Sequence, residues 1–326
     1  MPGHRWISPA SRETLVPTED GFKDGQYEYP VDSNGIPNFI FPRELPQADQ
    51  RAKDFYDGRA NDYEQYLHLT FETYGEDETL VRQDMVDLLL IEADSKVLEV
   101  ACGTGRDSVH IAEKLSAFGQ FDLTDISLDM ILVAKEKLSK VAPDVTLCLS
   151  NAMYLPFPDN YYDAVYSFGA AGEFSDQTQF FSELVRVTKP GGKVVVGDEN
   201  LPVWQRKTEF GRIVANYNPQ FLAEVPFRHL PKEARQVRCQ WVIGGVFYVL
   251  DFVVGEGEPY GNFDFNIPGV RGGTHRSRMY GNLEGVKEET KALALKAREK
   301  LGLSMHEWLD EMIRTEAEKV LKESDD

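Results

Sequence analysis

A glycine-containing loop at residues 102–105 carries the strongest chemical signal in the sequence. The apolar run VLEVA at 97–101 leads into CGTG, and a helical pattern follows. Glycine tolerates the positive φ angles of a sharp turn, and its missing Cβ lets a ligand approach the backbone closely. The first N–H groups of the following helix would point at the same place. We therefore predict that this loop binds a ligand.

Two residues around this loop argue against a dinucleotide and for a ligand that carries a positive charge. Position 108 is serine, so the third glycine of the dinucleotide pattern GxGxxG is missing. Glu99 places a carboxylate inside the strand, which is unusual at a pyrophosphate site. A carboxylate near the ligand suits a cation, such as the sulfonium and amino groups of S-adenosylmethionine.

A second carboxylate, Asp125, closes the next predicted strand, twenty residues after Gly105. At that position it can accept hydrogen bonds from both hydroxyls of a ribose, an interaction that uncharged groups match poorly. The alternative is that Asp125 caps the helix that follows, although Ser127 or Asp129 can fill that role instead.

Several segments resemble, in the correct order, the motifs of class I S-adenosylmethionine-dependent methyltransferases. EVACGTG at 99–105 resembles motif I of the family, and NAMYLPFPDNYYDAVYS at 151–167 resembles the stretch that closes over adenine. LVRVTKPGGKVVVGD at 184–198 resembles the helix, turn and fifth strand of the fold. FYDGRANDYEQY at 55–66 is similar to the aromatic lid helix of the ubiquinone/menaquinone-type branch. The resemblance spans about 50–255 and implies S-adenosylmethionine as cofactor, but it does not indicate the acceptor.

The resemblance also implies which residues hold the cofactor. Asn151 departs from the family, in which an acidic residue often occupies this position, but its amide can still meet an adenine amino group. Tyr56 and Tyr63 of the lid segment are expected to cover the cofactor and contact the substrate, with core packing as the alternative. The expected cofactor contacts are Glu99, Ala101, Cys102, Gly103, Thr104, Gly105, Asp125, Ile126, Met130, Asn151, Ala152, Met153 and Phe168.

No single catalytic side chain is required by this chemistry, because methyl transfer from a sulfonium is an in-line displacement that mainly needs alignment and a dry pocket. A phenol, an amine or an acidic carbon as acceptor can need one general base. Glu173 and Asp176 lie in the loop after the fourth predicted strand, at the edge where such sheets bind ligands. They and His275 are the candidates, and a solvated or capping carboxylate is the alternative for the first two.

The pattern from residue 96 onward predicts the fold. Short apolar strands expected at 96–101, 120–125, 144–149, 162–169 and 193–199 alternate with helices expected at 106–117, 128–140 and 176–188. Nearly continuous apolar strands are typical of a parallel sheet covered on both faces. Two further apolar runs meet at Gly244-Gly245, which predicts an antiparallel hairpin over 237–255. We therefore predict an α/β, Rossmann-like, doubly wound seven-stranded sheet whose last hairpin is antiparallel.

Three regions are expected along the chain. Residues 1–50 are rich in proline and turn residues and predict an irregular N-terminal arm, with one or two short strands at 25–42. This arm resembles the tail of a small zinc-ribbon module but lacks its cysteines, so no metal is expected. Residues 51–255 form the methyltransferase domain, with lid helices over 51–93. Residues 256–326 comprise a basic, glycine-rich loop and a helical C-terminal extension.

The C-terminal region carries two further features. Arg271, His275, Arg276 and Arg278 stand among glycines, as in an anion-binding loop, and we expect them to contact an acidic acceptor, with ion pairs inside the protein as the alternative. Residues 287–321 resemble the two helices of ribbon-helix-helix proteins, with a break at 300–304. In that family a strand precedes the helices and builds a dimer. The segment 275–281 is therefore expected as the strand, and the helices as a homodimer contact or a lid.

Composition limits the partners. A net charge of −19 disfavours nucleic acids and anionic membranes. No apolar run approaches the roughly 18 residues of a membrane-spanning helix. Three widely spaced cysteines indicate neither a disulfide framework nor a metal site, and they fit the reducing cytoplasm.

We therefore predict a cytoplasmic enzyme that transfers a methyl group from S-adenosylmethionine to a small-molecule acceptor. One alternative is a macromolecular acceptor, RNA or protein. The Asn/Asp-Pro-Pro-aromatic signature of nucleic-acid amino-methylases is missing at SFGAAGEF, which disfavours nucleic acid. The other alternative is a non-catalytic cofactor-binding or regulatory protein, against which the intact Gly103, Gly105 and Asp125 argue.

Overall fold

The computed structural model describes residues 6–139, 141, 143–270, 272–280 and 286–323. The chain divides into two compact units, Met1–Pro259 and Tyr260–Asp326, which are described separately. The first unit contains every segment that resembles a methyltransferase.

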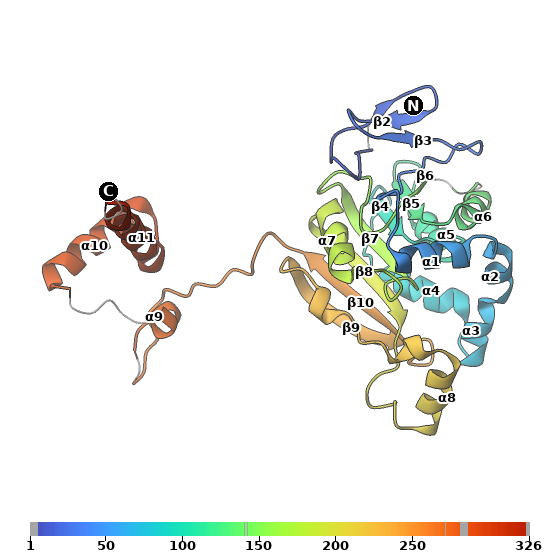
Figure 1. Cartoon of the computed structure of the whole chain (residues 1–326). Coiled ribbons are helices and arrows are strands. Elements are labelled where there is room, and N and C mark those ends of the chain that lie inside the picture. Colours follow the sequence, from blue (N-terminus) through green and yellow to red (C-terminus); the bar gives the residue numbers. More distant parts are fainter. Residues whose placement is uncertain (1–5, 140, 142, 271, 281–285, 324–326) are drawn as a thin grey trace. The chain divides into compact units, whose positions relative to one another are not determined.

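A seven-stranded sheet with the order β6-β5-β4-β7-β8-β10-β9 forms the centre of the first unit (Figure 1). Strands β4 to β8 are parallel, and β10 runs antiparallel to both β8 and β9. The predicted doubly wound sheet with an antiparallel hairpin is confirmed. The order reverses between β4 and β7, and ligands bind such sheets at this switch point. The strands are β4 Lys96–Val100, β5 Gln120–Asp125, β6 Asp144–Leu149, β7 Tyr162–Phe168, β8 Thr188–Glu199, β9 Ala234–Val242 and β10 Phe247–Val254.

Helices cover both faces of this sheet because successive side chains along a strand point to opposite faces and are apolar on both. In β4, Val97 packs in the cluster that holds Ile111 and Ile131, whereas Leu98 packs in the cluster that holds Leu184. Figure 1 accordingly shows α7 on one side of the sheet and α5 and α6 on the other. The covering helices are α4 Glu78–Asp87, α5 Arg106–Lys114, α6 Leu128–Leu138 and α7 Gln177–Val187.

The N-terminal region is part of the same core. Its Trp6, Tyr29 and Phe39 are buried in the cluster on the α7 side of the sheet. The Phe39 N–H donates to the Leu149 carbonyl at 2.8 Å, and the Leu149 N–H donates to the Pro37 carbonyl at 2.9 Å. The segment around Phe39 thus pairs with β6 and covers the edge of the large sheet. Of the one or two strands expected at 25–42, the structure has β3 Glu28–Pro30. It belongs to a three-stranded antiparallel sheet whose other strands, β1 Val16–Pro17 and β2 Gly21–Lys23, lie before the predicted segment.

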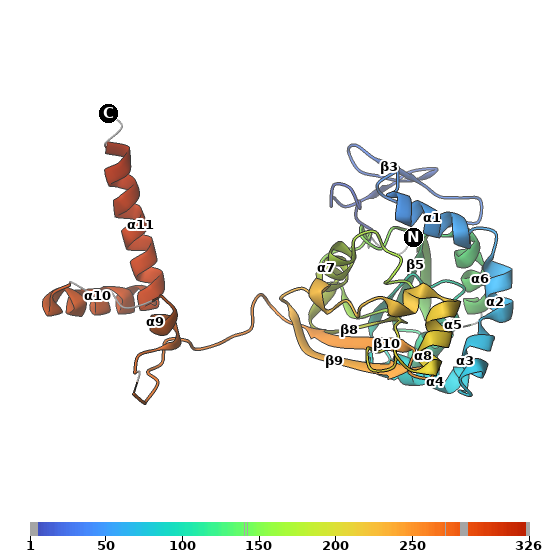
Figure 2. The same ribbon diagram turned by 60° about the horizontal axis from the view of Figure 1, so that its bottom comes forward.

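The expected lid region consists of several short helices, α1 Gln47–Tyr56, α2 Ala60–Tyr66 and α3 His68–Thr73, followed by α4. No sequence pattern indicated α8 Glu209–Tyr217 or the 3-10 helices η1 Pro219–Leu222 and η2 Phe227–His229. Figures 1 and 2 place α8 at the same end of the molecule as α3. The Tyr74 ring, just after α3, lies 6.2 Å from the Phe210 ring of α8. These elements enclose space beyond the ends of the strands.

Strand β8 begins earlier than predicted. The Lys-Pro-Gly-Gly segment at 189–192 was expected as a turn, but it lies inside β8 as an irregularity between the pairs Tyr162–Thr188 and Ala164–Lys193. An added Cβ at Gly192 would lie 2.8 Å from the Asp163 carbonyl oxygen, so the glycine lets the two strands stay close there.

The second unit is helical, with α9 His275–Tyr280, α10 Glu288–Leu301 and α11 Met305–Glu323. Gly302, at φ +70°, ends α10, and Ser304 accepts a hydrogen bond from the Glu307 N–H, so the predicted break is confirmed. The prediction of a strand at 275–281 is wrong for the described residues 275–280. Thr274 and Ser277 each accept a hydrogen bond from the other's N–H at 3.1 and 2.8 Å, and this reciprocal cap starts a helix. Among all described helices, none combines the length and the apolar character needed to cross a bilayer.

Candidate functional site

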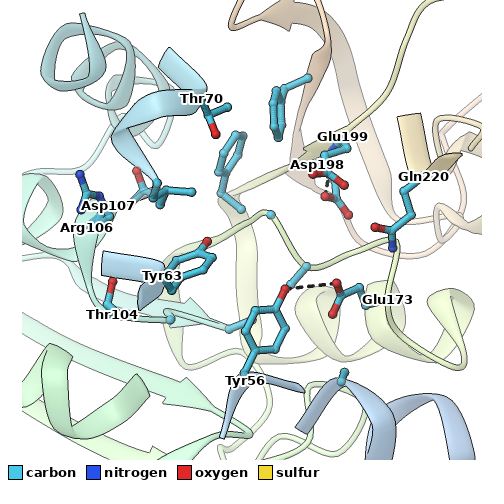
Figure 3. Close-up of a pocket in the computed structure, with 18 of the residues that line it drawn as sticks. Tyr56, Tyr63, Thr70, Thr104, Arg106, Asp107, Glu173, Asp198, Glu199 and Gln220 are labelled. Atoms are coloured by element: carbon cyan, nitrogen blue, oxygen red, sulfur yellow. Dashed lines mark hydrogen bonds between the residues drawn. The ribbon is translucent and has the colours of Figure 1, made fainter. Parts of the chain in front are cut away.

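A cavity of about 1080 Å³ lies at the carboxyl ends of β4, β5, β6 and β7 (Figure 3). It exceeds the roughly 300–1,000 Å³ of a typical pocket for one small ligand. Its walls come from the loops after these strands, from α1 to α3, and from α8 with η1. The volume and the walls allow two small molecules to lie side by side.

The loop after β4 forms the first wall. Gly103 has a φ of +52°, and a Cβ built on it would meet nothing within 4 Å, so a ligand can approach its backbone. The Gly103 N–H donates to Asp125 Oδ2 at 2.8 Å, and the Ser127 N–H donates to Asp125 Oδ1 at 2.9 Å. Ser127 is itself the cap of α6, because its hydroxyl accepts from the Met130 N–H. Asp125 is therefore not the cap, and its buried carboxylate borders the cavity.

Two of the expected cofactor contacts do not border the cavity. Gly105 has a φ of +76°, and an added Cβ would lie 3.1 Å from the Cβ of Ala134, so this glycine lets α5 pack against α6. Met153 is buried beneath the loop after β6, where its N–H donates to Asn151 Oδ1 at 3.0 Å. The remaining expected contacts all border it, namely Glu99, Ala101, Cys102, Gly103, Thr104, Asp125, Ile126, Met130, Asn151, Ala152 and Phe168.

Asn151 borders the cavity and carries a buried donor without a partner among the described residues. Its side chain is 1% exposed. Because Oδ1 accepts the Met153 N–H, the amide is oriented with Nδ2 on the other side, and Nδ2 has no hydrogen-bond partner among the described residues. A buried donor without a partner is costly, so its position beside a cavity indicates a ligand that accepts a hydrogen bond.

Glu99 lies deeper in the same wall. Ser108 donates a hydrogen bond to Glu99 Oε2 at 2.5 Å. Burial, followed by the nearby negative charge of Asp107, raises the pKa of Glu99 well above its usual range. A hydrogen bond from the protein thus holds the Glu99 carboxyl group beside the loop at 102–105, in the strand where the sequence predicted it.

The lid helices are joined to these loops by polar contacts. The Thr104 hydroxyl donates to Glu64 on α2 at 2.6 Å. Tyr56 donates from its hydroxyl to Glu173 Oε1 at 3.1 Å, and its ring lies 6.1 Å from the Tyr63 ring in an edge-on arrangement. Tyr56, Tyr63 and Glu173 all border the cavity (Figure 3), and their contact with a cofactor or substrate stays a prediction.

The far end of the cavity combines apolar rings with carboxylates. Figure 3 shows Glu173, Asp198 and Glu199 on the side opposite Thr104 and Arg106. The apolar residues that border the cavity from α3, β7, α8, η1 and the β9–β10 hairpin are Phe71, Tyr74, Phe168, Phe210, Ile213, Val214, Tyr217, Phe221, Ile243 and Phe247. We call the part of the cavity between these residues and the three carboxylates the acceptor end.

Asp198 and Glu199 were missed by the sequence reasoning. Asp198 accepts hydrogen bonds from the Gly172 and Glu199 N–H groups, and Glu199 accepts one from Asn218 Nδ2 at 3.2 Å. Burial raises the pKa of Asp198 to about 6. Burial and the charges of Asp198 and Glu173 raise the pKa of Glu199 to about 7. Their position at the carboxyl end of β8, the edge that also carries Asp125, was a signal that could have found them.

Other candidate residues have structural contacts of their own. Asp176 is exposed and caps α7 by accepting the Gln179 N–H at 3.0 Å, which was the alternative considered for it. Asp163 of β7, which was not among the predicted site residues, accepts a hydrogen bond from the Lys96 N–H at 2.8 Å and pairs with Lys189, so these contacts also serve the fold.

The basic loop candidates belong to the second unit. Arg276 pairs with Asp264 at 3.2 Å, and Arg278 Nε donates to the Gly272 carbonyl at 3.0 Å. The His275 ring lies edge-on between the Phe263 and Phe265 rings, 6.1 Å from each. Arg271 lies outside the described residues. A contact of these groups with an acceptor stays a prediction.

Comparison with known proteins identifies the family. Residues 97–192 match the family described as a methyltransferase domain. A demethylmenaquinone methyltransferase of Listeria monocytogenes serotype 4a is 34% identical over 129 residues, which cover 38% of this chain and 54% of the relative. The ubiquinone/menaquinone biosynthesis C-methyltransferase UbiE of Chromobacterium violaceum is 33% identical over 173 residues, which cover 48% of this chain and 70% of the relative. The chain belongs to the class I S-adenosylmethionine-dependent methyltransferases.

S-adenosylmethionine is accordingly the cofactor of this methyltransferase. The residues present fit it, because the open cradle at Gly103 and the unpaired amide of Asn151 border the same cavity. The methyltransferase spans about half the length of the Listeria relatives it matches. Phosphoethanolamine N-methyltransferase 2 of Haemonchus contortus, solved with S-adenosylmethionine, is 16% identical, with 68% of this chain and 62% of that chain covered and a TM-score of 0.48.

Proposed function

We propose that this methyltransferase holds S-adenosylmethionine along the loop at 101–105 and transfers its methyl group to a small molecule at the acceptor end. Asp125 accepts hydrogen bonds from the ribose hydroxyls, and Asn151 donates to the adenine ring. The observation that carries this proposal is the continuity of the cavity, which joins the unpaired Asn151 amide and the open Gly103 backbone to an apolar chamber beyond them.

The cofactor supplies a methyl group on a sulfonium, so that a lone pair of the acceptor bonds to the methyl carbon as the carbon–sulfur bond breaks and its electrons stay on sulfur. The protein has to align the acceptor and exclude water. Tyr56 and Tyr63 close the cavity on the lid side, and the rings of Phe168 and Phe247, stacked at 5.7 Å, line the opposite side. Glu199, with a pKa of about 7, suits the role of a general base when the acceptor must lose a proton.

A small-molecule acceptor is favoured over a macromolecule by the charges at the site. The acceptor end is bordered by three carboxylates, which repel the phosphates of RNA. Lid helices and α8 border the cavity from several sides, and this enclosure suits a molecule small enough to enter completely.

Calorimetric titration of the full chain with S-adenosylmethionine and with S-adenosylhomocysteine tests the proposal. We expect one molecule of each to bind per chain, and Asp125→Asn to weaken both by at least tenfold through loss of the charged ribose contact. Asp176→Asn is the matched control, because it changes the same group on an exposed cap outside the cavity. Folded protein that takes up neither compound would remove the proposed function.

Two wider expectations accompany the proposal. A cytoplasmic location is supported by the wide spacing of the three cysteines in the sequence, which gives no disulfide framework. A homodimer through α10 and α11 is supported by exposed apolar side chains on both helices, and the mass of the full chain in solution by light scattering tests it. These side chains are Leu293, Leu295, Leu301, Met312, Ile313, Val320 and Leu321.

A further inference from the structure

We infer that the acceptor is an organic amine that enters as an ammonium ion, held by Glu173, Asp198 and Glu199 with its apolar part against the aromatic rings. This inference rests on the proposed function and specifies its substrate class. It reverses the sign of the charge expected for the acceptor from the basic loop.

Within the described part of the chain, the hydrogen-bond partners of the three carboxylates at the acceptor end are all neutral. Glu173 is bonded to the Tyr56 hydroxyl, Asp198 to two backbone N–H groups, and Glu199 to the Asn218 amide. Among the described residues no lysine, arginine or histidine forms an ion pair with any of them, and the groups that shift their pKa values include no cation. Their negative charge is therefore uncompensated within the described protein.

The basic residues that border the cavity are already paired. Arg82 binds Asp107 at 2.7 Å and Glu78 at 2.8 Å. Arg106 binds Glu78 at 2.6 Å and Glu64 at 3.0 Å. No other lysine or arginine is found among the described residues that line the cavity. The field at the acceptor end is consequently negative, and an anionic acceptor would be repelled.

The pKa values of the three carboxylates are raised for the same reason, namely that no cation compensates their negative charge. Removing a carboxylate from water is costly unless a cation or several donors compensate it. Without a cation, burial raises the pKa values of Glu173, Asp198 and Glu199. An ammonium group bound among them would remove this cost, which explains why three carboxylates converge on an otherwise apolar chamber.

Aromatic rings complete a site for a cation with an apolar body. The face of an aromatic ring attracts a cation, and its carbon surface buries apolar groups. The ring centre of Phe247 lies 5.7 Å from the ring centres of both Phe168 and Phe221. The ring centres of Tyr74 and Phe210 lie 6.2 Å apart. Independently of the carboxylates, Asn151 borders the same cavity and has a buried amide nitrogen without a partner among the described residues, which favours a ligand at this site.

The reaction balances with a carboxylate as the proton acceptor. The ammonium N–H bond breaks and its proton passes to Glu199, which leaves a neutral amine with a lone pair. That lone pair forms the nitrogen–carbon bond while the carbon–sulfur bond breaks with its electrons remaining on sulfur. The products are an N-methylated ammonium ion and S-adenosylhomocysteine. Because only the neutral amine is nucleophilic, a base beside the bound ammonium is required.

Three probes that share a phenyl group and differ in charge test the inference. Protein saturated with S-adenosylhomocysteine is titrated calorimetrically with phenethylamine, 2-phenylethanol and 3-phenylpropionate at neutral pH. We expect the ammonium to bind at least tenfold more tightly than the alcohol, and the carboxylate to bind most weakly. Equal binding of all three, tighter binding of the alcohol or the carboxylate, or no binding of the ammonium would overturn the inference.

Variants assign the preference to the carboxylates. Glu199→Gln and, separately, Glu173→Gln are expected to reduce the ammonium preference at least tenfold, while an unchanged affinity for S-adenosylhomocysteine shows that each variant is folded. Glu209→Gln is the control, because it makes the same change on an exposed residue of α8 outside the cavity. An ammonium preference that survives both cavity variants would overturn the assignment. Failure of S-adenosylhomocysteine to bind the unaltered protein would instead count against the proposed function.

Discussion

The Thr104 hydroxyl donates a hydrogen bond to Glu64 Oε2 at 2.6 Å and so ties the loop after β4 to lid helix α2. The same carboxylate binds Arg106 at 3.0 Å and Lys137 at 2.9 Å. Burial alone would raise the pKa of Glu64, but the hydrogen bonds from Thr104 and Lys137 outweigh it and the pKa is lowered. Glu64 is therefore ionised at neutral pH and holds three groups at once.

Weakening this contact should loosen the lid over the cofactor. We expect Glu64→Gln to speed the dissociation of S-adenosylhomocysteine by about tenfold, because hydrogen bonds to a charged group contribute about 1.5–3 kcal/mol. Stopped-flow fluorescence measures the rate. Glu72→Gln is the control, since Glu72 is largely exposed and lies 3.8 Å from the His68 ring. Equal dissociation rates in the two variants would show that α2 does not retain the cofactor.

A methyl group at Gly103 should block the cofactor. In Gly103→Ala the new Cβ would project into open space in the cavity, and we expect the Kd of S-adenosylmethionine to rise at least tenfold. Gly35→Ala is the control, because Gly35 also has a positive φ, at +76°, and open space around its Cβ, but it does not border the cavity. Both variants should lose about 1–2 kcal/mol of stability to backbone strain. Equal cofactor affinity in the two would contradict the placement of the cofactor against this loop.

Reversing the polarity at Asn151 should also weaken cofactor binding. In Asn151→Asp one carboxylate oxygen can keep the hydrogen bond from the Met153 N–H, while the other oxygen, an acceptor, replaces the unpaired Nδ2 donor of this cavity-lining residue. Two acceptors would then face each other, and we expect calorimetry to show at least a tenfold loss of affinity for S-adenosylhomocysteine. Tighter binding in the variant would mean that the adenine presents its amino group, not a ring nitrogen, to this residue.

The raised pKa of Glu199 predicts how stability depends on pH. Since its pKa is about 7 in the folded protein and about 4.5 when unfolded, the folded state binds more protons between these values. This contribution to stability is present below about pH 4.5 and is lost as the pH rises through 7. Glu199→Gln removes the titration, so at pH 8 the variant should be more stable than the unaltered protein by on the order of 1–3 kcal/mol.

Urea unfolding at pH 5, 6.5 and 8 measures this effect. The difference in the free energy of unfolding between Glu199→Gln and the unaltered protein should widen steadily from pH 5 to pH 8. Glu209→Gln, on the exposed side of α8, should show no such trend. A difference that does not vary with pH would contradict the buried, uncompensated state of Glu199.

The central sheet was predictable because each strand carries its own signal. The bounds of β5 and β6 agree with the prediction, since each strand is a short run of strand-favouring residues that follows a helical pattern. The loop proposed to hold the cofactor was predicted in the same way, because its glycines follow β4 and Asp125 ends β5. The role of Gly105 differs from the one expected. A side chain at position 105 would crowd Ala134 on the neighbouring helix α6, so the glycine serves helix packing.

Features that depend on distant contacts were not predictable. The acceptor end collects residues from Phe71 to Phe247, and no local pattern indicates that they meet. Strands β1 to β3 have two or three residues each, too few to show a period. The segment 275–280 was predicted as a strand from its resemblance to ribbon-helix-helix proteins, but reciprocal hydrogen bonds between Thr274 and Ser277 start a helix there.

The pairing of the Phe39 segment with β6 bears on how far this protein can be shortened. Residues 97–192, which carry the family match, depend on the first forty residues for the cover of one sheet edge and for the ring of Trp6 in the core. Deleting those residues would bare the backbone of β6, two residues from Asn151, and offer it to strands of other molecules. A trimmed protein would therefore precipitate by edge-to-edge association rather than serve as a smaller enzyme.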